Sequence, residues 1–184
     1  FGEDVNNLKT TENTKNIASS YYGLSKIIAE NNLRITFKEN PKLFTIIRMP
    51  RIYGPGDSIK NYGPTKFVSS VLNKEIITIW GKGDELREFI HIDDIVSIFH
   101  KIIDKNIYGN INIASGKSYT FIDVILAIEK ILKKKVNYTF KKRDGKLVNH
   151  VFDNSKFNKT FKNYKFIDLQ KGIKDLISKN KFTR

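Results

Sequence analysis

The hydrophobic and polar positions of this chain follow two periods in turn, and they predict helices and strands that alternate along the sequence. The first predicted helix covers residues 17–39 and ends before Pro41. Residues 43–49 follow as a short, almost continuously apolar strand, which is typical of a parallel sheet that is covered on both faces. Residues 1–16 are polar and rich in turn-forming residues, and they predict a surface loop.

The rest of the sequence repeats this order. Further helices are predicted at 64–73, 93–103, 121–132, 154–162 and 168–179. Further strands are predicted at 76–80, 89–92, 110–114 and 135–140, with loops at 50–57 and 81–88. Asp93 can cap the helix that follows it, and Thr120 with Asp123 forms a capping box. Alternating helices and strands indicate an α/β fold.

Composition narrows the classes of protein that need to be considered. With 184 residues, of which 40% are hydrophobic, the chain can bury a substantial core. It has no cysteine, which excludes disulfides and thiolate metal sites, and a reducing cytoplasm is the expected compartment. No apolar run approaches the roughly 20 residues that a membrane span requires.

The net charge of +14 raises the question of nucleic-acid binding. Lys outnumbers Arg 27 to 6, and the lysines are spread over the whole chain. Proteins that read phosphates and bases usually show clustered arginines and exposed aromatic side chains instead. We therefore expect no nucleic-acid partner and no membrane association.

Tyr22 and Lys26 are four residues apart at the start of the first predicted helix. About one Tyr-x-x-x-Lys pair is expected by chance in a chain of this composition, and three occur. Tyr62/Lys66 straddles a Gly-Pro pair and Tyr138/Lys142 lies in a predicted strand, whereas residues i and i+4 of a helix share a face. A phenol has an ordinary pKa of about 10, so it needs a nearby cation to exchange protons near neutrality.

Five segments in order extend this observation: YGLSKIIAE, IIRMPRIYGPGD, WGKGDELREFIHIDD, NINIASG and VFDNSKF. In this order they resemble the extended short-chain dehydrogenase/reductase family, and within it the NAD-dependent nucleotide-sugar epimerases and dehydratases. The resemblance covers roughly residues 1 to 180. It implies the last part of a Rossmann-type parallel sheet plus a smaller α/β substrate-binding lobe.

The Gly-rich loop with which this family holds the cofactor pyrophosphate does not occur in the sequence. The chain also opens with FGED and has its one Met at position 49. We therefore expect the carboxy-terminal part of a larger enzyme, inactive alone. Residues 1–52 would complete the NAD-binding domain, and residues 53–184 would form mainly the substrate lobe, with some elements returning to the NAD-binding domain.

The resemblance also implies roles for individual residues. Tyr22 would be the catalytic acid/base, and Lys26 would bind the cofactor ribose and favour the phenolate; the alternative is a surface helix pair. Pro50 would lie at the cofactor. The cofactor would be NAD, with NADP as the alternative, and the reaction would proceed at sugar C4 through a transient keto intermediate.

Substrate binding is expected from four residues: Arg51, Trp80, Arg87 and Arg143. The fork of Arg87 suits the two phosphoryl oxygens of a nucleotide-diphosphate sugar, and an exposed loop arginine is the alternative. Trp80 could stack on the base or could end a strand in the core. Arg51 replaces an Asn that is common in the family, and an added cation would suit a phosphate or an acidic sugar.

No metal site is expected, because the three histidines are scattered and no carboxylate cluster lies near them at ligand spacing. A homodimer through the helix that carries Tyr22 is expected from the family. The competing enzymatic function is a GDP-4-keto-6-deoxy-sugar epimerase/reductase, and the non-enzymatic one is a basic binding module or an inactive fragment. A dehydratase would need acid/base residues that precede Phe1.

Overall fold

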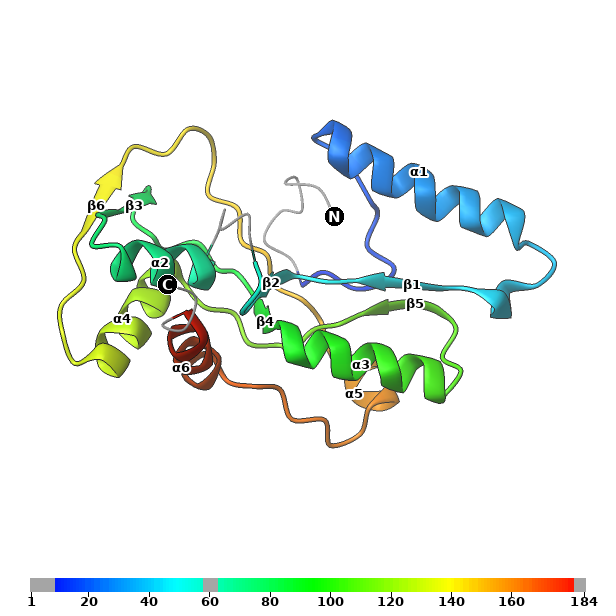
Figure 1. Cartoon of the computed structure of the whole chain (residues 1–184). Helices are drawn as coiled ribbons and strands as arrows, with labels where there is room; N and C mark the ends of the chain where they lie inside the picture. The colour runs from blue at the N-terminus through cyan, green and yellow to red at the C-terminus, as the bar shows by residue number, and fades with distance from the viewer. Residues whose placement is uncertain (1–8, 58–62, 181–184) are drawn as a thin grey trace.

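The computed structural model describes residues 9–57 and 63–180 (Figure 1). Within these ranges every pair of hydrogen-bonded strands is parallel. The pairs are β1 (Thr45–Arg48) with β5 (Gly109–Asn112), β2 (Arg51–Tyr53) with β4 (Phe89–His91), and β3 (Ile77–Trp80) with β6 (Tyr138–Lys141). The α-helices are α1 (Tyr21–Thr36), α2 (Gly63–Leu72), α3 (Ile92–Asp104), α4 (Phe121–Leu132), α5 (Ser155–Thr160) and α6 (Leu169–Asn180). Parallel strands joined through helices confirm the α/β fold.

Helix α1 and strand β1 run side by side in opposite directions (Figure 1). The helix begins after Ser20, whose hydroxyl accepts the Gly23 N–H at 3.1 Å. The chain then returns as β1, and Arg48 in that strand pairs with Glu30 of the helix through two contacts of 2.9 and 2.6 Å. The first turn of α1, with Tyr22, therefore lies toward the same end of the molecule as the carboxyl end of β1.

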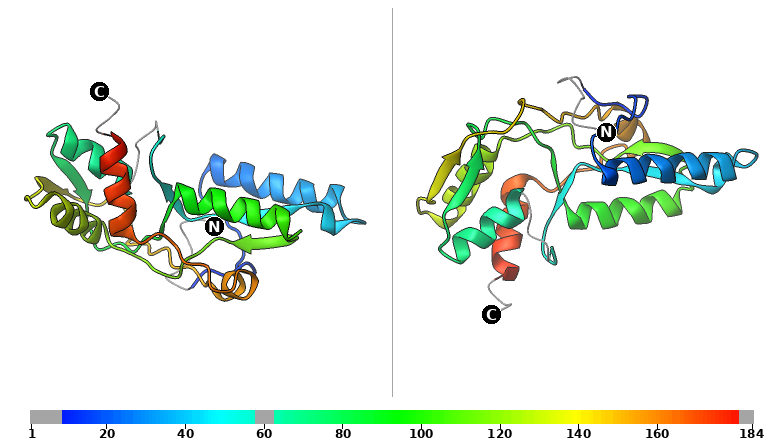
Figure 2. Two further views of the ribbon diagram at one scale, coloured as in Figure 1. Left: turned by 60° about the horizontal axis from the view of Figure 1, so that its bottom comes forward. Right: turned by 90° about the horizontal axis from the view of Figure 1, so that it is seen from above.

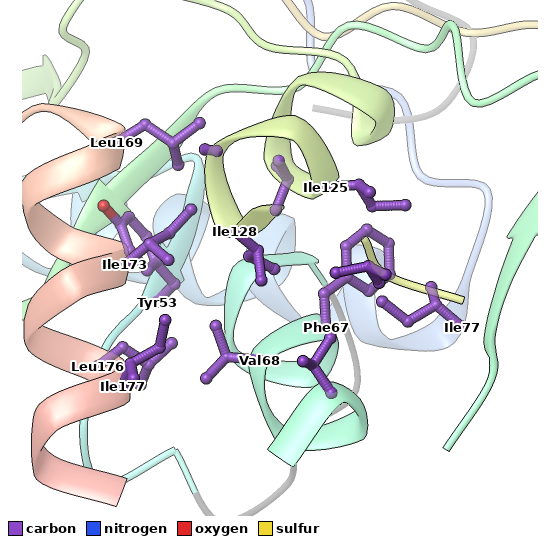
Figure 3. Packing of buried hydrophobic residues seen from close by; sticks show 14 of the residues in the cluster. Tyr53, Phe67, Val68, Ile77, Ile125, Ile128, Leu169, Ile173, Leu176 and Ile177 are labelled. Carbon is purple, nitrogen blue, oxygen red and sulfur yellow. The ribbon is translucent and has the colours of Figure 1, made fainter. Parts of the chain in front are cut away.

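The larger hydrophobic core lies between α2, α4 and α6, beside β3 (Figure 3). Val68, Ile128 and Leu176, one from each helix, are each no more than 1% exposed. Tyr53 from β2 enters the same core and connects it to the middle of the molecule. This core fixes the lobe that lies away from α1.

A second core lies where α3 covers the β1–β5 pair and α5 closes it from another side (Figure 2). Ile98 of α3, Ile111 of β5 and Phe157 of α5 are almost completely buried there. Strand β5, which follows α3, pairs with β1 and so brings a later part of the sequence back to the amino-terminal part. The division of the chain at residue 52 stays a prediction.

Four expectations from the sequence need correction. The predicted loop 50–57 contains strand β2, which pairs with β4. Within β1 only Ile46 is buried, so the strand is not covered on both faces among the described residues. Helix α3 is capped by His91, whose Nδ1 accepts the Asp93 N–H at 3.3 Å, and not by Asp93. Thr10, predicted in a surface loop, is 3% exposed and bridges to Phe152.

The other predicted helices and strands are present with shifts of a few residues at their ends. The capping box forms as expected, with the Thr120 hydroxyl accepting the Asp123 N–H at 3.0 Å and the Asp123 carboxylate accepting the Thr120 N–H at 2.8 Å. Residues 1–8 and Tyr62 lie outside the described part of the chain.

Candidate functional site

A pocket of about 200 Å³ opens where β1 ends and β2 begins. Four separate segments meet there: residue 10, the β1–β2 junction at residues 49–51, residues 87–88 before β4, and the extended stretch of residues 148–152 that precedes α5. The lining residues are Thr10, Met49, Pro50, Arg51, Arg87, Glu88, His150 and Phe152. The carboxyl end of a parallel strand is where open α/β folds bind ligands.

Backbone hydrogen bonds hold these segments against one another. The His150 N–H donates to the Leu86 carbonyl at 3.0 Å, and the Leu86 N–H donates to the side chain of Asn149 at 2.8 Å. The Arg51 N–H donates to the Glu88 carbonyl at 3.2 Å. The Thr10 N–H donates to the Val151 carbonyl at 2.8 Å and so holds residue 10 against the extended stretch. The walls of the pocket are therefore fixed by the main chain.

Arg87 lies in the wall of the pocket with only 7% of its surface exposed. Its guanidinium donates to the carbonyls of Leu86 and Val148, and it pairs with the Glu85 carboxylate at 3.0 Å. The alternative of an exposed loop arginine is therefore wrong. Arg87 ties the approach to β4 to the extended stretch, whatever ligand it also contacts.

Arg143 contacts the other oxygen of the same carboxylate. Its Nε lies 2.8 Å from Glu85 Oε1, and one of its terminal nitrogens lies 3.1 Å from Asp84. Gly81 makes room for it, since a Cβ at that position would come within 2.6 Å of the guanidinium carbon. Two arginines that the sequence singled out, Arg87 and Arg143, are thus brought together by Glu85, which sequence reasoning missed.

Glu88 is the acidic group of the pocket and is 1% exposed. One carboxylate oxygen accepts the N–H groups of Ser115 and Gly116, which follow β5. Burial raises the pKa of Glu88, and the hydrogen bonds from Ser115 and Gly116 oppose that rise. Its other oxygen, Oε2, has no hydrogen-bond partner within the described ranges.

His150 was not singled out from the sequence, although it immediately precedes the VFDNSKF segment. Burial, followed by the charges of Arg87 and Arg51, lowers the pKa of His150 to about 4. The imidazole is therefore neutral at physiological pH. A lone histidine in an irregular stretch carries no periodic signal, so its placement could only come from the fold.

Tyr22 and Lys26 share one face of α1, as their spacing predicts. The Lys26 ammonium lies 5.1 Å from the centre of the Tyr22 ring, and both side chains are exposed. Tyr22 and its neighbour Tyr21 are 73% and 92% exposed. A phenol beside an ammonium, accessible from outside the chain, suits contact with a nicotinamide ribose and a sugar hydroxyl. These roles stay predictions.

Trp80 lies at the end of β3 and is 46% exposed. Lys141 of the paired strand β6 lies 4.6 Å from the centre of its ring system. The alternative of a core tryptophan is therefore wrong, and stacking of Trp80 on a base stays a prediction. The pocket contains Pro50, Arg51 and Arg87, but Trp80 and Arg143 are not among its lining residues.

The fold also gathers His91, Asp93 and Asp175, with ligand atoms within 4.8 Å of one another. The sequence argument against a metal relied on the absence of nearby carboxylates, and it missed Asp175 because that residue comes from α6. The two ring nitrogens face different partners: Nδ1 lies 3.7 Å from Asp93, and Nε2 lies 3.5 Å from Asp175. Asp175 also pairs with Lys179 at 3.0 Å. Because Nδ1 already accepts the Asp93 N–H, Nε2 is the ring nitrogen that faces the Asp175 carboxylate.

No helix in the described part of the chain is long and apolar enough to cross a membrane.

The model of the NAD dependent epimerase/dehydratase family matches residues 1–114. A dTDP-D-glucose 4,6-dehydratase of Dictyostelium discoideum is 33% identical over 132 residues, which is 70% of this chain and 30% of that protein. A dTDP-4-dehydro-6-deoxyglucose reductase of Escherichia coli is 34% identical over 117 residues, 62% of this chain and 37% of that protein.

Solved structures show the same fold. The UDP-glucose 4-epimerase of Thermotoga maritima superposes with a TM-score of 0.84 at 22% identity, over 99% of this chain and 60% of that one. A mutant of the UDP-glucuronic acid 4-epimerase of Bacillus cereus, in complex with UDP-4-deoxy-4-fluoro-glucuronic acid and NAD, gives 0.83 at 24% identity, over 95% of this chain and 56% of that one. The chain spans 30% and 37% of the lengths of the Dictyostelium discoideum and Escherichia coli relatives. It belongs to the NAD-dependent epimerase/dehydratase family.

Proposed function

We propose that this chain forms the carboxy-terminal part of an NAD-dependent nucleotide-sugar epimerase that acts at sugar C4. One observation supports this most strongly. A fixed pocket with two arginines lies at the carboxyl end of β1, and a Tyr–Lys pair begins the helix that runs beside that strand. A group that binds diphosphate and a group that exchanges protons are thus oriented toward the same end of the molecule.

The chemistry assigned to this chain is proton transfer. A bound NAD would supply the hydride acceptor for this chemistry. Tyr22 Oη removes the proton from the sugar C4 hydroxyl. It returns that proton after the keto intermediate has turned its other face toward the nicotinamide. The Lys26 ammonium, which lies 5.1 Å from the centre of the Tyr22 ring, binds the cofactor ribose in this proposal.

The pocket supplies the substrate anchor in this proposal. Arg51 and Arg87 line it from two adjacent segments, and a diphosphate carries two anionic groups that guanidinium groups bind well. Because Arg87 already donates to three protein acceptors, the substrate would use its remaining N–H groups and the field of both cations. Arg51 is then the more accessible of the two contacts.

The test replaces Tyr22 with Phe, with Tyr21→Phe as a matched control, since Tyr21 is the adjacent and even more exposed tyrosine. The 184 residues contain no Gly-rich loop, so turnover is measured in a polypeptide that joins them to a Gly-rich NAD-binding half. General acid/base catalysis contributes about 10²–10⁴-fold, and Tyr22→Phe should lose that factor while Tyr21→Phe retains near-normal turnover. Near-normal turnover in Tyr22→Phe would refute the assignment.

The relatives that resemble this chain also include reductases and dehydratases. The same assay separates the epimerase from a reductase when it is run with a 4-keto-6-deoxy sugar nucleotide and NADPH beside the 4-hydroxy substrate. Interconversion of C4 epimers without net oxidation supports the epimerase. Consumption of NADPH with the keto sugar would instead assign the reductase.

Three further features belong to the same proposal. We place the protein in the cytoplasm, in the synthesis of polysaccharide precursors. We also propose a homodimer through α1, because none of its residues is buried and several apolar ones, including Leu24 and Ile28, are 44–50% exposed. Light scattering on Ile28→Lys, with Lys38→Ala as a surface control, tests the dimer; an unchanged mass would argue against it.

A further inference from the structure

His150 occupies a place in the pocket that the proposed chemistry leaves unused. Its backbone is fixed to Leu86, so the ring is held against the pocket and cannot swing out with a loose loop. Its Nε2 is buried and has no hydrogen-bond partner within residues 9–57 and 63–180. A buried nitrogen with no partner is costly, which points to a ligand group as its natural partner.

The charged groups that line the pocket with His150 come from both neighbouring segments. Arg51 starts β2, while Arg87 and Glu88 precede β4. Burial and the two arginines hold the pKa of His150 at about 4. An anion between the arginines would cancel their field and add negative charge beside the ring, and both changes favour imidazolium.

We propose that His150 is a ligand-binding residue of this pocket, which donates a hydrogen bond to the diphosphate that Arg51 and Arg87 attract and takes up one proton as that diphosphate binds. This inference rests on the proposed function, because it takes the anion to be the diphosphate of a nucleotide sugar. Its consequence is that affinity for the nucleotide sugar increases as the pH falls.

The sign follows from linkage. Free His150 is neutral above about pH 4, and neutralising the arginine charges raises the pKa of bound His150 above that value, while burial continues to lower it. Between these two values the complex holds a proton that the free protein lacks. Binding at pH 5.5 should then be tighter than at pH 7.5 by up to about tenfold, with up to about three quarters of a proton taken up at pH 6.0, the limits that hold if the ordinary pKa is fully restored.

The experiment measures binding of UDP-glucose and dTDP-glucose to the 184-residue chain by calorimetry, in two buffers of different ionisation enthalpy. The diphosphates of these probes have no second ionisation near neutrality, unlike a terminal phosphate. His150→Gln removes the titrating group but keeps a hydrogen-bond donor. His100→Gln, on the exposed face of α3, is the matched histidine control. Glu88→Gln tests whether the buried carboxyl takes up the proton instead.

Proton uptake that disappears in His150→Gln and persists in the other two variants supports the proposal. Uptake that disappears in Glu88→Gln and persists in His150→Gln overturns it. Binding with no proton uptake also overturns it while leaving the proposed function intact, whereas no binding of either probe overturns both. Should His150→Gln fail to fold, NMR titration of the histidine rings in the unmodified chain decides, since a ring pKa near 4 must rise when UDP-glucose is added.

Discussion

Replacing Arg87 with Ala should destabilise the whole chain, because this side chain is a buried structural tie as well as a candidate ligand contact. Its loss removes donors from the Leu86 and Val148 carbonyls and one of the two arginines that pair with Glu85. Breaking a buried charge pair from one side typically costs about 3–5 kcal/mol. Since Arg143 still pairs with Glu85, we expect the lower end, about 3 kcal/mol.

For a chain of this size, each kcal/mol corresponds to a shift of about 2–4 °C in Tm, so Arg87→Ala should unfold about 6–12 °C earlier. Circular dichroism during thermal and urea unfolding measures this. Arg34→Ala is the matched control: its side chain is 43% exposed, it lies 3.8 Å from Glu30, and its loss should cost less than about 1 kcal/mol. A loss below 1 kcal/mol for Arg87→Ala would refute the structural role.

The affinity of Arg87→Ala has to be measured well below its reduced Tm. A charge-assisted hydrogen bond contributes about 1.5–3 kcal/mol, so direct contact predicts a roughly 10- to 100-fold weaker affinity for the nucleotide sugar. The affinity for NAD should change much less. Equal losses for both ligands would show that Arg87 acts only through the fold.

Two other predictions concern stability. The hydrogen bond from Arg48 lowers the pKa of Glu30. The pair therefore stabilises the fold at pH values above the ordinary glutamate pKa of about 4.5, and this contribution is lost as the pH falls through the lower pKa of the folded state. Glu30→Gln should flatten the acid side of the curve of stability against pH, whereas the exposed control Glu39→Gln should not. A Cβ on Gly172 would lie 2.0 Å from the Tyr53 hydroxyl. Gly172→Ala should therefore lower the free energy of unfolding, measured in urea, by about 1–3 kcal/mol, and by less in a Tyr53→Phe background. Equal losses in both backgrounds would contradict the packing argument.

The sequence predicted the helices and most strands because their signals are local. The capping box at Thr120 and the Tyr22–Lys26 spacing depend only on neighbouring residues, and both take the predicted local geometry. Strand β2 was read as a loop because Pro and Gly flank only three strand residues, whose pairing partner lies on a distant strand. Periodicity cannot detect a pairing of that kind.

The same distinction holds at the candidate site. Arg51, Arg87 and Pro50 were found through their motifs, and the fold brings them into one pocket. Glu85 and His150 were missed, because their roles come from contacts between segments about 60 residues apart along the chain. Asp175 beside His91 is a similar case. When the role of a side chain depends on tertiary contacts, the neighbouring sequence carries no pattern that reveals it.

The exclusively parallel pairing of the described strands has a consequence for how the chain folds. Thr45 pairs with Gly109 and Ile77 with Tyr138, so about sixty residues must be placed before either pair can close. The entropy of closing such loops is lost before any contact compensates for it, and chains with distant contacts fold slowly. Helices α1 and α4 can form early from local interactions, while β1 and β3 wait for their partners. During that interval the unpaired edges of these strands can pair with other chains. Expression at lower temperature, or together with chaperones that bind the nascent chain, should therefore increase the yield of folded protein.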